Sequence, residues 1–86
     1  MICLGDSMNI SKDNNKYIYV LVGKNIKRIR KEKHLTQVEL ADLIKYNEGT
    51  IANIENNSYQ TFSLEFVYII SKKLNVPITE FFKPID

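Results

Sequence analysis

The stretch 36–57, TQVELADLIKYNEGTIANIENN, decides the fold of this chain, because it contains start signals for two short helices. Thr36 and Glu39 form a capping box, in which each side chain accepts a hydrogen bond from the other residue's backbone N–H. Asn47 is a good N-cap for a second helix, since its side-chain oxygen can accept from a backbone N–H of the first turn. Two short helices joined by a tight turn are therefore expected.

The apolar residues of this stretch give each helix one buried face. Leu40, Ala41 and Ile44 recur at a helical spacing on the first helix. Ile51 and Ile54 form a narrower apolar seam on the second. The other faces of the second helix are polar or small, and so are available to contact something: Glu48, Gly49, Thr50, Asn53 and Asn56.

Two helices joined by a turn of three or four residues form the helix-turn-helix unit, whose second helix enters the major groove of DNA. The motifs in and around this unit resemble those of the Cro and phage-repressor family, also called the XRE family: Leu35-Thr36-Gln37, Glu39-Leu40-Ala41, Thr50-Ile51 and Ile54-Glu55-Asn56. The similarity covers about residues 22–82 and includes Ser63-Leu64-Glu65, Leu74-Asn75-Val76-Pro77 and Glu80-Phe81-Phe82. The resemblance implies a lambda-repressor-like, DNA-binding fold.

The composition is that of one small globular domain. The chain has 86 residues, of which 44% are hydrophobic and 26% charged, a size at which a single core is marginal and oligomerisation would help. The single cysteine, Cys3, cannot form an internal disulfide, and the longest apolar run, 18–22, is too short to span a bilayer. We expect a cytoplasmic protein with no membrane association.

Charge is distributed unevenly along the chain. Residues 24–33 include six basic residues and one acid, a local charge of +5, whereas residues 36–58 include one basic residue and four acids, a local charge of −3. A solvated face is the plain interpretation of the basic run. Beside a helix-turn-helix unit, we also expect Lys27 and Arg28 to contact DNA phosphates, so that attraction comes mainly from outside the second helix.

Three further helices follow from capping residues and apolar spacing. A first helix is expected from about Val20 to Lys33, although the run 17–22 would also suit a strand. Ser63 caps a helix at 64–74, and Pro77 suits the start of a short helix that ends near Phe82. The fold class is therefore all-α, a five-helix orthogonal bundle with a central helix-turn-helix.

The two ends of the chain differ in character. Residues 1–19 are expected to form a flexible N-terminal extension, because they are mostly polar and lack a usable period, and Met8 is an alternative start. Residues 20–86 are expected to form one helix-turn-helix DNA-binding domain.

The family resemblance also assigns roles to individual residues. It implies a salt bridge between Arg30 and Glu55 that joins the first helix to the recognition helix, at about 47–56, and a phosphate contact from Gln37. The positions from which the family contacts bases correspond to Glu48, Gly49, Thr50 and Asn53. Further phosphate contacts are expected from Lys45, Asn47, Asn56 and Asn57.

Chemistry ranks the candidate base readers. The amide of Asn53 can bond N6 and N7 of adenine together, whereas the carboxylate of Glu48 can accept from cytosine N4 but repels phosphates. Gly49 either allows a close approach of backbone and base or simply weakens the helix without a function. Lys45 stands where the family usually has a turn glycine, and is expected to be forced to a positive φ at about 1 kcal/mol or more.

The C-terminal residues carry more apolar surface than one small core needs. One interpretation is that most are simply buried; the other is a homodimer interface formed by Tyr68, Phe81, Phe82 and Ile85. No catalytic pattern accompanies them: His34 is the only histidine, and no phosphate-binding glycine loop or metal-spaced Cys/His set is present. We expect no enzyme activity, no cofactor, no metal and no small-molecule ligand.

Two hypotheses about function follow. The first is a sequence-specific transcriptional regulator, expected to be a repressor, that binds double-stranded DNA as a homodimer at half-sites roughly 34 Å apart. The alternative is a protein-interaction module, such as an antitoxin or antirepressor partner, that uses the same helical surface. The net acidity of residues 36–58 motivates the alternative.

Overall fold

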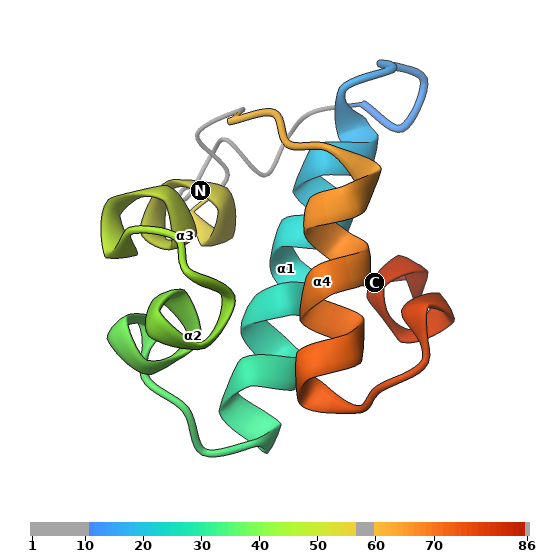
Figure 1. Ribbon diagram of the computed structural model, residues 1–86. Helices are drawn as coiled ribbons and strands as arrows, with labels where there is room; N and C mark the ends of the chain where they lie inside the picture. The colour runs from blue at the N-terminus through green and yellow to red at the C-terminus, as the bar shows by residue number, and fades with distance from the viewer. Residues whose placement is uncertain (1–10, 57–59, 86) are drawn as a thin grey trace.

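A computed structural model describes residues 11–56 and 60–85 of the chain. These residues form four α-helices and one 3₁₀ helix: α1 (Tyr17–Glu32), α2 (Gln37–Ile44), α3 (Glu48–Glu55), α4 (Leu64–Leu74) and η2 (Ile78–Phe82). Figure 1 shows α2 and α3 on one side of α1 and α4, and η2 on the other. The all-α prediction is confirmed for the part of the chain that the structure describes.

The fifth helix differs from the one expected. The segment after Pro77 is the 3₁₀ helix η2 rather than an α-helix, and it ends before Pro84. Two prolines so close together leave too few residues for α-helical hydrogen bonds, and 3₁₀ geometry suits such short segments.

Helix α1 begins earlier than predicted. It starts at Tyr17, so residues 17–19, which we assigned to the flexible extension, are helical. Turns precede it: the backbone N–H of Lys16 donates to Asn14 Oδ1 at 2.8 Å, and that of Tyr17 donates to the Asn14 carbonyl at 2.9 Å. The rest of the predicted extension, including Met8, falls largely in residues 1–10, which lie outside the described residues.

The predicted caps are present. The Glu39 N–H donates to Thr36 Oγ1 at 3.0 Å and the Thr36 N–H donates to Glu39 Oε1 at 2.8 Å, which completes the capping box of α2. Asn47 Oδ1 caps α3 by accepting from the Thr50 N–H at 2.7 Å. Ser63 caps α4 in the same way, accepting from Phe66 at 3.1 Å. These local bonds set where each helix begins.

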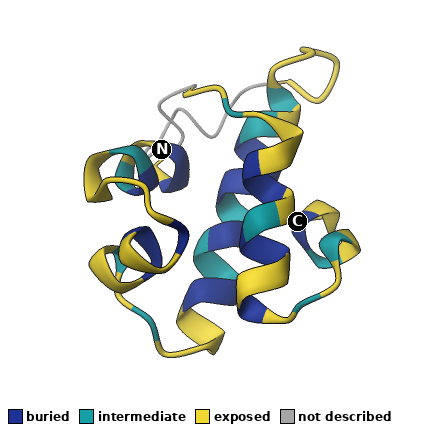
Figure 2. Cartoon of the chain, in the orientation of Figure 1, coloured by how far each residue is buried: buried dark blue, intermediate teal, exposed yellow. Residues whose placement is uncertain are grey.

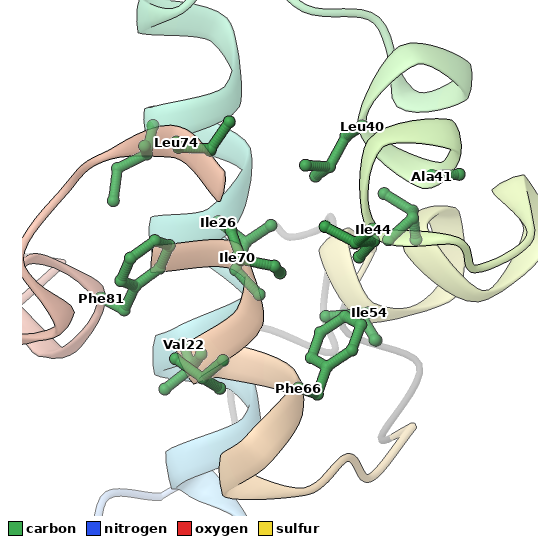
Figure 3. Close-up of a cluster of buried hydrophobic side chains, with 13 residues drawn as sticks. Val22, Ile26, Leu40, Ala41, Ile44, Ile54, Phe66, Ile70, Leu74 and Phe81 are labelled. Carbon is green, nitrogen blue, oxygen red and sulfur yellow. The ribbon is translucent and has the colours of Figure 1, made fainter. Parts of the chain in front are cut away.

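All four α-helices and η2 contribute to one hydrophobic core. Buried residues form a continuous line along the inward faces, whereas the turns and outer faces are exposed (Figure 2). In the close-up of Figure 3, Leu40 and Ile44 of α2 point toward Ile26 and Ile70, and Phe81 enters from the opposite side. No helix in the described ranges is long and apolar enough to cross a membrane.

Candidate nucleic-acid interface

Helix α3 lies in close contact with α1 because Gly23 has no side chain. A Cβ at Gly23 would overlap the backbone carbonyl of Ile54, near the C-terminal end of α3. Ile51 and Ile54 are buried on the inward face of α3 and pack in the core cluster with the apolar residues of α2. Sequence reasoning missed Gly23, since a lone glycine in a helical pattern does not reveal what approaches it.

A buried ion pair fixes the end of α3. Arg30 Nε donates to Glu55 Oε2 at 2.7 Å, and a second guanidinium nitrogen donates to Oε1 at 2.9 Å. The third guanidinium nitrogen donates to the Leu35 carbonyl at 2.7 Å, so Arg30 also holds the segment before α2. The hydrogen bond to Glu55 raises the pKa of Arg30 above its ordinary value. Forked pairing of this kind holds α3 in one orientation.

Gln37 joins the same network. Its Nε2 donates to Glu55 Oε1 at 3.1 Å. The buried pair therefore orients the Gln37 side chain, which is expected to contact phosphate. Glu55 therefore accepts from both α1 and the first turn of α2. The three residues tie the start of α2 to the end of α3.

The candidate base readers lie on the exposed part of α3. Glu48, Gly49 and Asn53 are exposed, and Thr50 is half-buried. Asn53 Nδ2 donates to Gln60 Oε1 at 3.4 Å, a contact across the loop that sequence reasoning did not anticipate. Glu48 lies in the first turn, where the helix dipole stabilises its negative charge.

The expected phosphate contacts differ in their surroundings. Lys45 is exposed in the turn between α2 and α3, and Asn56 is exposed just after the end of α3. Asn47 is exposed as well, but its Oδ1 is occupied as the cap of α3. Asn57 lies outside the described residues.

Arg28, a predicted phosphate contact, makes contacts within the protein that sequence reasoning did not anticipate. Its guanidinium donates to Asn25 Oδ1 at 3.1 Å and to the Glu80 carbonyl at 2.9 Å, and a third contact joins Glu32 at 3.3 Å. Asn25 in turn donates to the carbonyls of Phe81 and Lys83, at 3.1 and 2.9 Å. We name the side chains of Asn25 and Arg28 the α1 clamp, because together they hold η2 on α1.

Lysines dominate the outer side of α1. Lys24 and Lys27 are half-buried and Lys31 is exposed. Burial, and secondarily the charge of Lys27, lowers the pKa of Lys24 below its ordinary value. With Arg28 engaged in the clamp, Lys27 is the stronger of the two predicted phosphate contacts on α1.

The residues expected at a dimer interface separate into two groups. Phe81 has no exposed surface, so its assignment to an interface is wrong: it fills the core between α1 and α4. Tyr68 and Phe82 are 52% and 36% exposed, and Ile85 is half-buried. Phe82 lines a shallow apolar groove of about 170 Å³ together with Ile18 and Leu64. Those last two residues were not predicted.

Metal-ligating side chains do not gather within residues 11–56 and 60–85. No group of three or more His, Cys, Asp and Glu side chains there is placed to hold a metal ion. The polar side chains that cluster instead serve caps, the buried pair or the α1 clamp.

The amino-acid sequence was also compared with those of known proteins and protein families. A family profile described as Helix-turn-helix matches residues 26–81. The chain is also similar to the antitoxin PezA of Streptococcus pneumoniae serotype 4 (strain ATCC BAA-334 / TIGR4), with 38% identity over 56 residues. That match covers 65% of this chain and 35% of PezA, so the chain spans about a third of the length of that relative.

Proposed function

Because the chain belongs to the helix-turn-helix family, we propose that it is a sequence-specific DNA-binding transcriptional regulator that acts as a homodimeric repressor. The resemblance to the Cro and phage-repressor family, drawn from the motifs, is confirmed by the same match. The recognition helix is α3 with its cap, about residues 47–56, and it enters the major groove.

The observation that carries the proposal is the way α3 is held. Its inward face is buried, its end is fixed by the Arg30–Glu55 pair, and its start is capped by Asn47. The remaining faces carry polar side chains with no core to pack against. A rigid helix with an exposed polar face is what reading of base edges requires, because a flexible reader would lose entropy on binding.

We assign two kinds of contact to this surface. Glu48, Gly49, Thr50 and Asn53 face the base edges, with Asn53 matched to adenine. Lys27, Gln37, Lys45 and Asn56 contact phosphates and set the register of the protein on the duplex. Asn47 contributes as the cap rather than through its occupied side-chain oxygen.

Selection of bound DNA from a random pool, followed by a salt titration, tests the proposal. Wild-type protein is expected to enrich one palindromic sequence and to bind it less tightly as salt rises. Lys27→Ala should weaken binding to selected and random DNA alike and flatten the salt dependence by about one phosphate contact. Asn53→Ala should instead lose about 1–3 kcal/mol of preference for the selected sequence.

Lys73→Ala is the matched control, since Lys73 is an exposed lysine in the last turn of α4. It should change neither the affinity nor the salt dependence. Recovery of random sequences, with no steep dependence on salt, would contradict DNA-binding regulation.

A second candidate function is a protein-interaction module of the antitoxin kind. One relative is described as an antitoxin, and α2 exposes apolar side chains beside acids. Val38, Leu43 and Tyr46 are 47%, 39% and 41% exposed, and Glu39 and Asp42 are exposed beside them. A partner with a basic, apolar surface would suit this face. Val38→Glu combined with Leu43→Glu should then abolish capture of that partner, whereas thermal melting should stay close to that of wild type.

A further inference from the structure

Gly49 is an exposed glycine that the fold itself does not require. No glycine among the described residues has a positive φ. A Cβ at Gly49 would meet only Asn47 Oδ1, at 3.4 Å, which is an ordinary contact distance. Alanine would fit this site and favour the helix, because glycine gains more freedom in the unfolded chain. The reason for glycine therefore lies outside the folded chain.

Helix geometry places Gly49 on the outermost line of α3. Ile51 and Ile54 mark the buried side, and Gly49, two residues before Ile51, lies about 200° around the helix from it. Asn53 follows four residues after Gly49 on the same exposed side. Gly49, the residue of the first turn of α3 that would lie deepest in the major groove, thus carries no side chain.

The neighbours of this notch decide what can fill it. Asn47 Oδ1, the nearest side-chain atom, is an acceptor already engaged with the Thr50 N–H, and Glu48 beside it is an exposed acid. Acceptors and negative charge disfavour a phosphate oxygen at this place. The C5-methyl of thymine is the apolar group that base edges offer in the major groove.

Resting on the proposed function, we propose that Gly49 forms a notch that receives the C5-methyl group of one thymine in each half-site. The Cα of Gly49 packs directly on that methyl, which brings the first turn of α3 closer to the base edges than any side chain would allow. Gly49 thereby determines specificity through its missing side chain, and Asn53 reads a base further along the same face.

The test combines a change in the protein with a change in the DNA. Binding of wild type, Gly49→Ala and Gly49→Leu is measured on the sequence selected from a random pool. Each thymine of a half-site is then replaced singly by deoxyuridine, which lacks only the methyl group. Binding to random DNA and thermal melting of each variant serve as controls.

Wild type should bind slightly less tightly when one particular thymine loses its methyl. Gly49→Ala should lose on the order of tenfold in affinity for the selected sequence, since two methyl groups compete for one space. Replacement of that same thymine by deoxyuridine should recover most of the affinity that Gly49→Ala loses. Gly49→Leu should lose more and should not be restored, because its side chain is too large for the vacated space.

Gly49→Ala should melt at or above the wild-type temperature, so that the loss of affinity is not one of folding. Wild-type affinity of Gly49→Ala for the selected sequence would overturn the notch. A loss that no deoxyuridine position relieves would overturn it as well. Absence of any preferred sequence for wild type would instead overturn the proposed function itself.

Discussion

Arg30 and Glu55 bring opposite charges into the protein interior, where their side chains are only 9% and 0% exposed. Removal of two charges from water is unfavourable, and it is offset here because two further groups complete the hydrogen bonding of the pair. Glu55 accepts from Gln37, and Arg30 donates to the Leu35 carbonyl. Such a pair contributes more to a unique arrangement than to net stability, and it is intolerant of losing one partner.

Replacement of Arg30 by alanine tests the burial of this pair. Arg30→Ala should lower the free energy of unfolding by about 3–5 kcal/mol, because it leaves the Glu55 carboxylate buried without its partner. Urea unfolding measures the change. Lys31→Ala, one residue further at an exposed site, should change it by less than about 0.5 kcal/mol. Equal stability of the two variants would show that the pair is solvated.

Lys45 holds a backbone conformation that non-glycine residues rarely adopt. Its φ of 63° and ψ of 44° place it in the left-handed region, as the sequence comparison with the family predicted. The turn requires this conformation because the chain must reverse between α2 and α3 within three residues. Lys45 thus carries strain of roughly 1 kcal/mol that a glycine would not.

Lys45→Gly should raise the free energy of unfolding by about 0.5–1 kcal/mol, since relief of strain exceeds the added freedom of the unfolded chain. Thermal melting should show an increase of a few degrees, roughly 4 °C or more per kcal/mol for a domain of this size. Lys45→Ala keeps the strain and removes the charge, so it should give no increase. An equal gain for both variants would assign the effect to the charge.

At the scale of elements, α1 packs against both α3 and η2. One face lies in the core, Gly23 receives the backbone of α3, and the α1 clamp holds η2. Aromatic rings add a further connection: Tyr46, in the turn between α2 and α3, packs edge-on against Phe66 with 4.9 Å between ring centroids. The position of the recognition helix therefore depends on α1 and α4 as much as on α2.

Gly23→Ala should disturb the α1–α3 contact. The new methyl would overlap the Ile54 carbonyl, and a backbone atom cannot move aside as a flexible side chain can. A loss of about 1–3 kcal/mol is expected from overpacking, measured by urea unfolding. Gly49→Ala is the matched control, and its free energy of unfolding should stay equal or rise. Tolerance of alanine at Gly23 would show that α3 can shift away.

Arg28→Ala tests the α1 clamp. Loss of the guanidinium removes the hydrogen bonds that Arg28 donates to Asn25 and to the Glu80 carbonyl. Segment η2 should therefore detach from α1 more often. Amide hydrogen exchange within η2 should accelerate, whereas exchange in α2 should not change. The salt dependence of DNA binding should stay that of wild type. If Arg28→Ala reduces the salt dependence of DNA binding as much as Lys27→Ala does, Arg28 leaves the clamp to contact phosphate.

At the scale of the whole molecule, an apolar groove lies on the surface, separate from the exposed apolar side chains of α2 and its turn. Ile18, Leu64 and Phe82 are 41%, 70% and 36% exposed and line one groove between the starts of α1 and α4 and the end of η2. A small domain that binds a palindrome gains from pairing two copies, because the second half-site then binds at high effective concentration. This groove, together with Tyr68 one helical turn after Leu64 on α4, is the surface we expect at the dimer interface.

Leu64→Glu should yield folded monomers that bind a single half-site weakly. The change adds a charge to the groove, yet a glutamate in the first turn of α4 is favourable for the helix dipole. Sedimentation velocity at micromolar concentration measures the oligomeric state of the variant. Phe81→Glu should unfold the protein instead, because that side chain is fully buried. A wild-type protein that sediments as a monomer at high micromolar concentration would contradict the dimer.

The family resemblance and the sequence pattern together predicted much of the candidate site. Capping residues, the apolar spacing of α2 and α3, and the matching positions of Arg30 and Glu55 are visible along the chain. The dimer stays a prediction, but Phe81 lies in the core rather than at the surface, since apolar composition near the C-terminus does not say which aromatic ring enters the core. Phe81 and Phe82 are neighbours in sequence but differ entirely in burial.

The sequence by itself determined α2, α3, α4 and their caps, because these depend on residues within one or two helical turns of each other. The tertiary structure alone decided the α1 clamp, the Gly23 contact and the orientation of Gln37 toward Glu55. Asn25 and the Phe81 carbonyl are 56 residues apart in the chain, and nothing local to either predicts their hydrogen bond. Such contacts exist only once distant helices pack, which places them beyond any pattern of neighbouring residues.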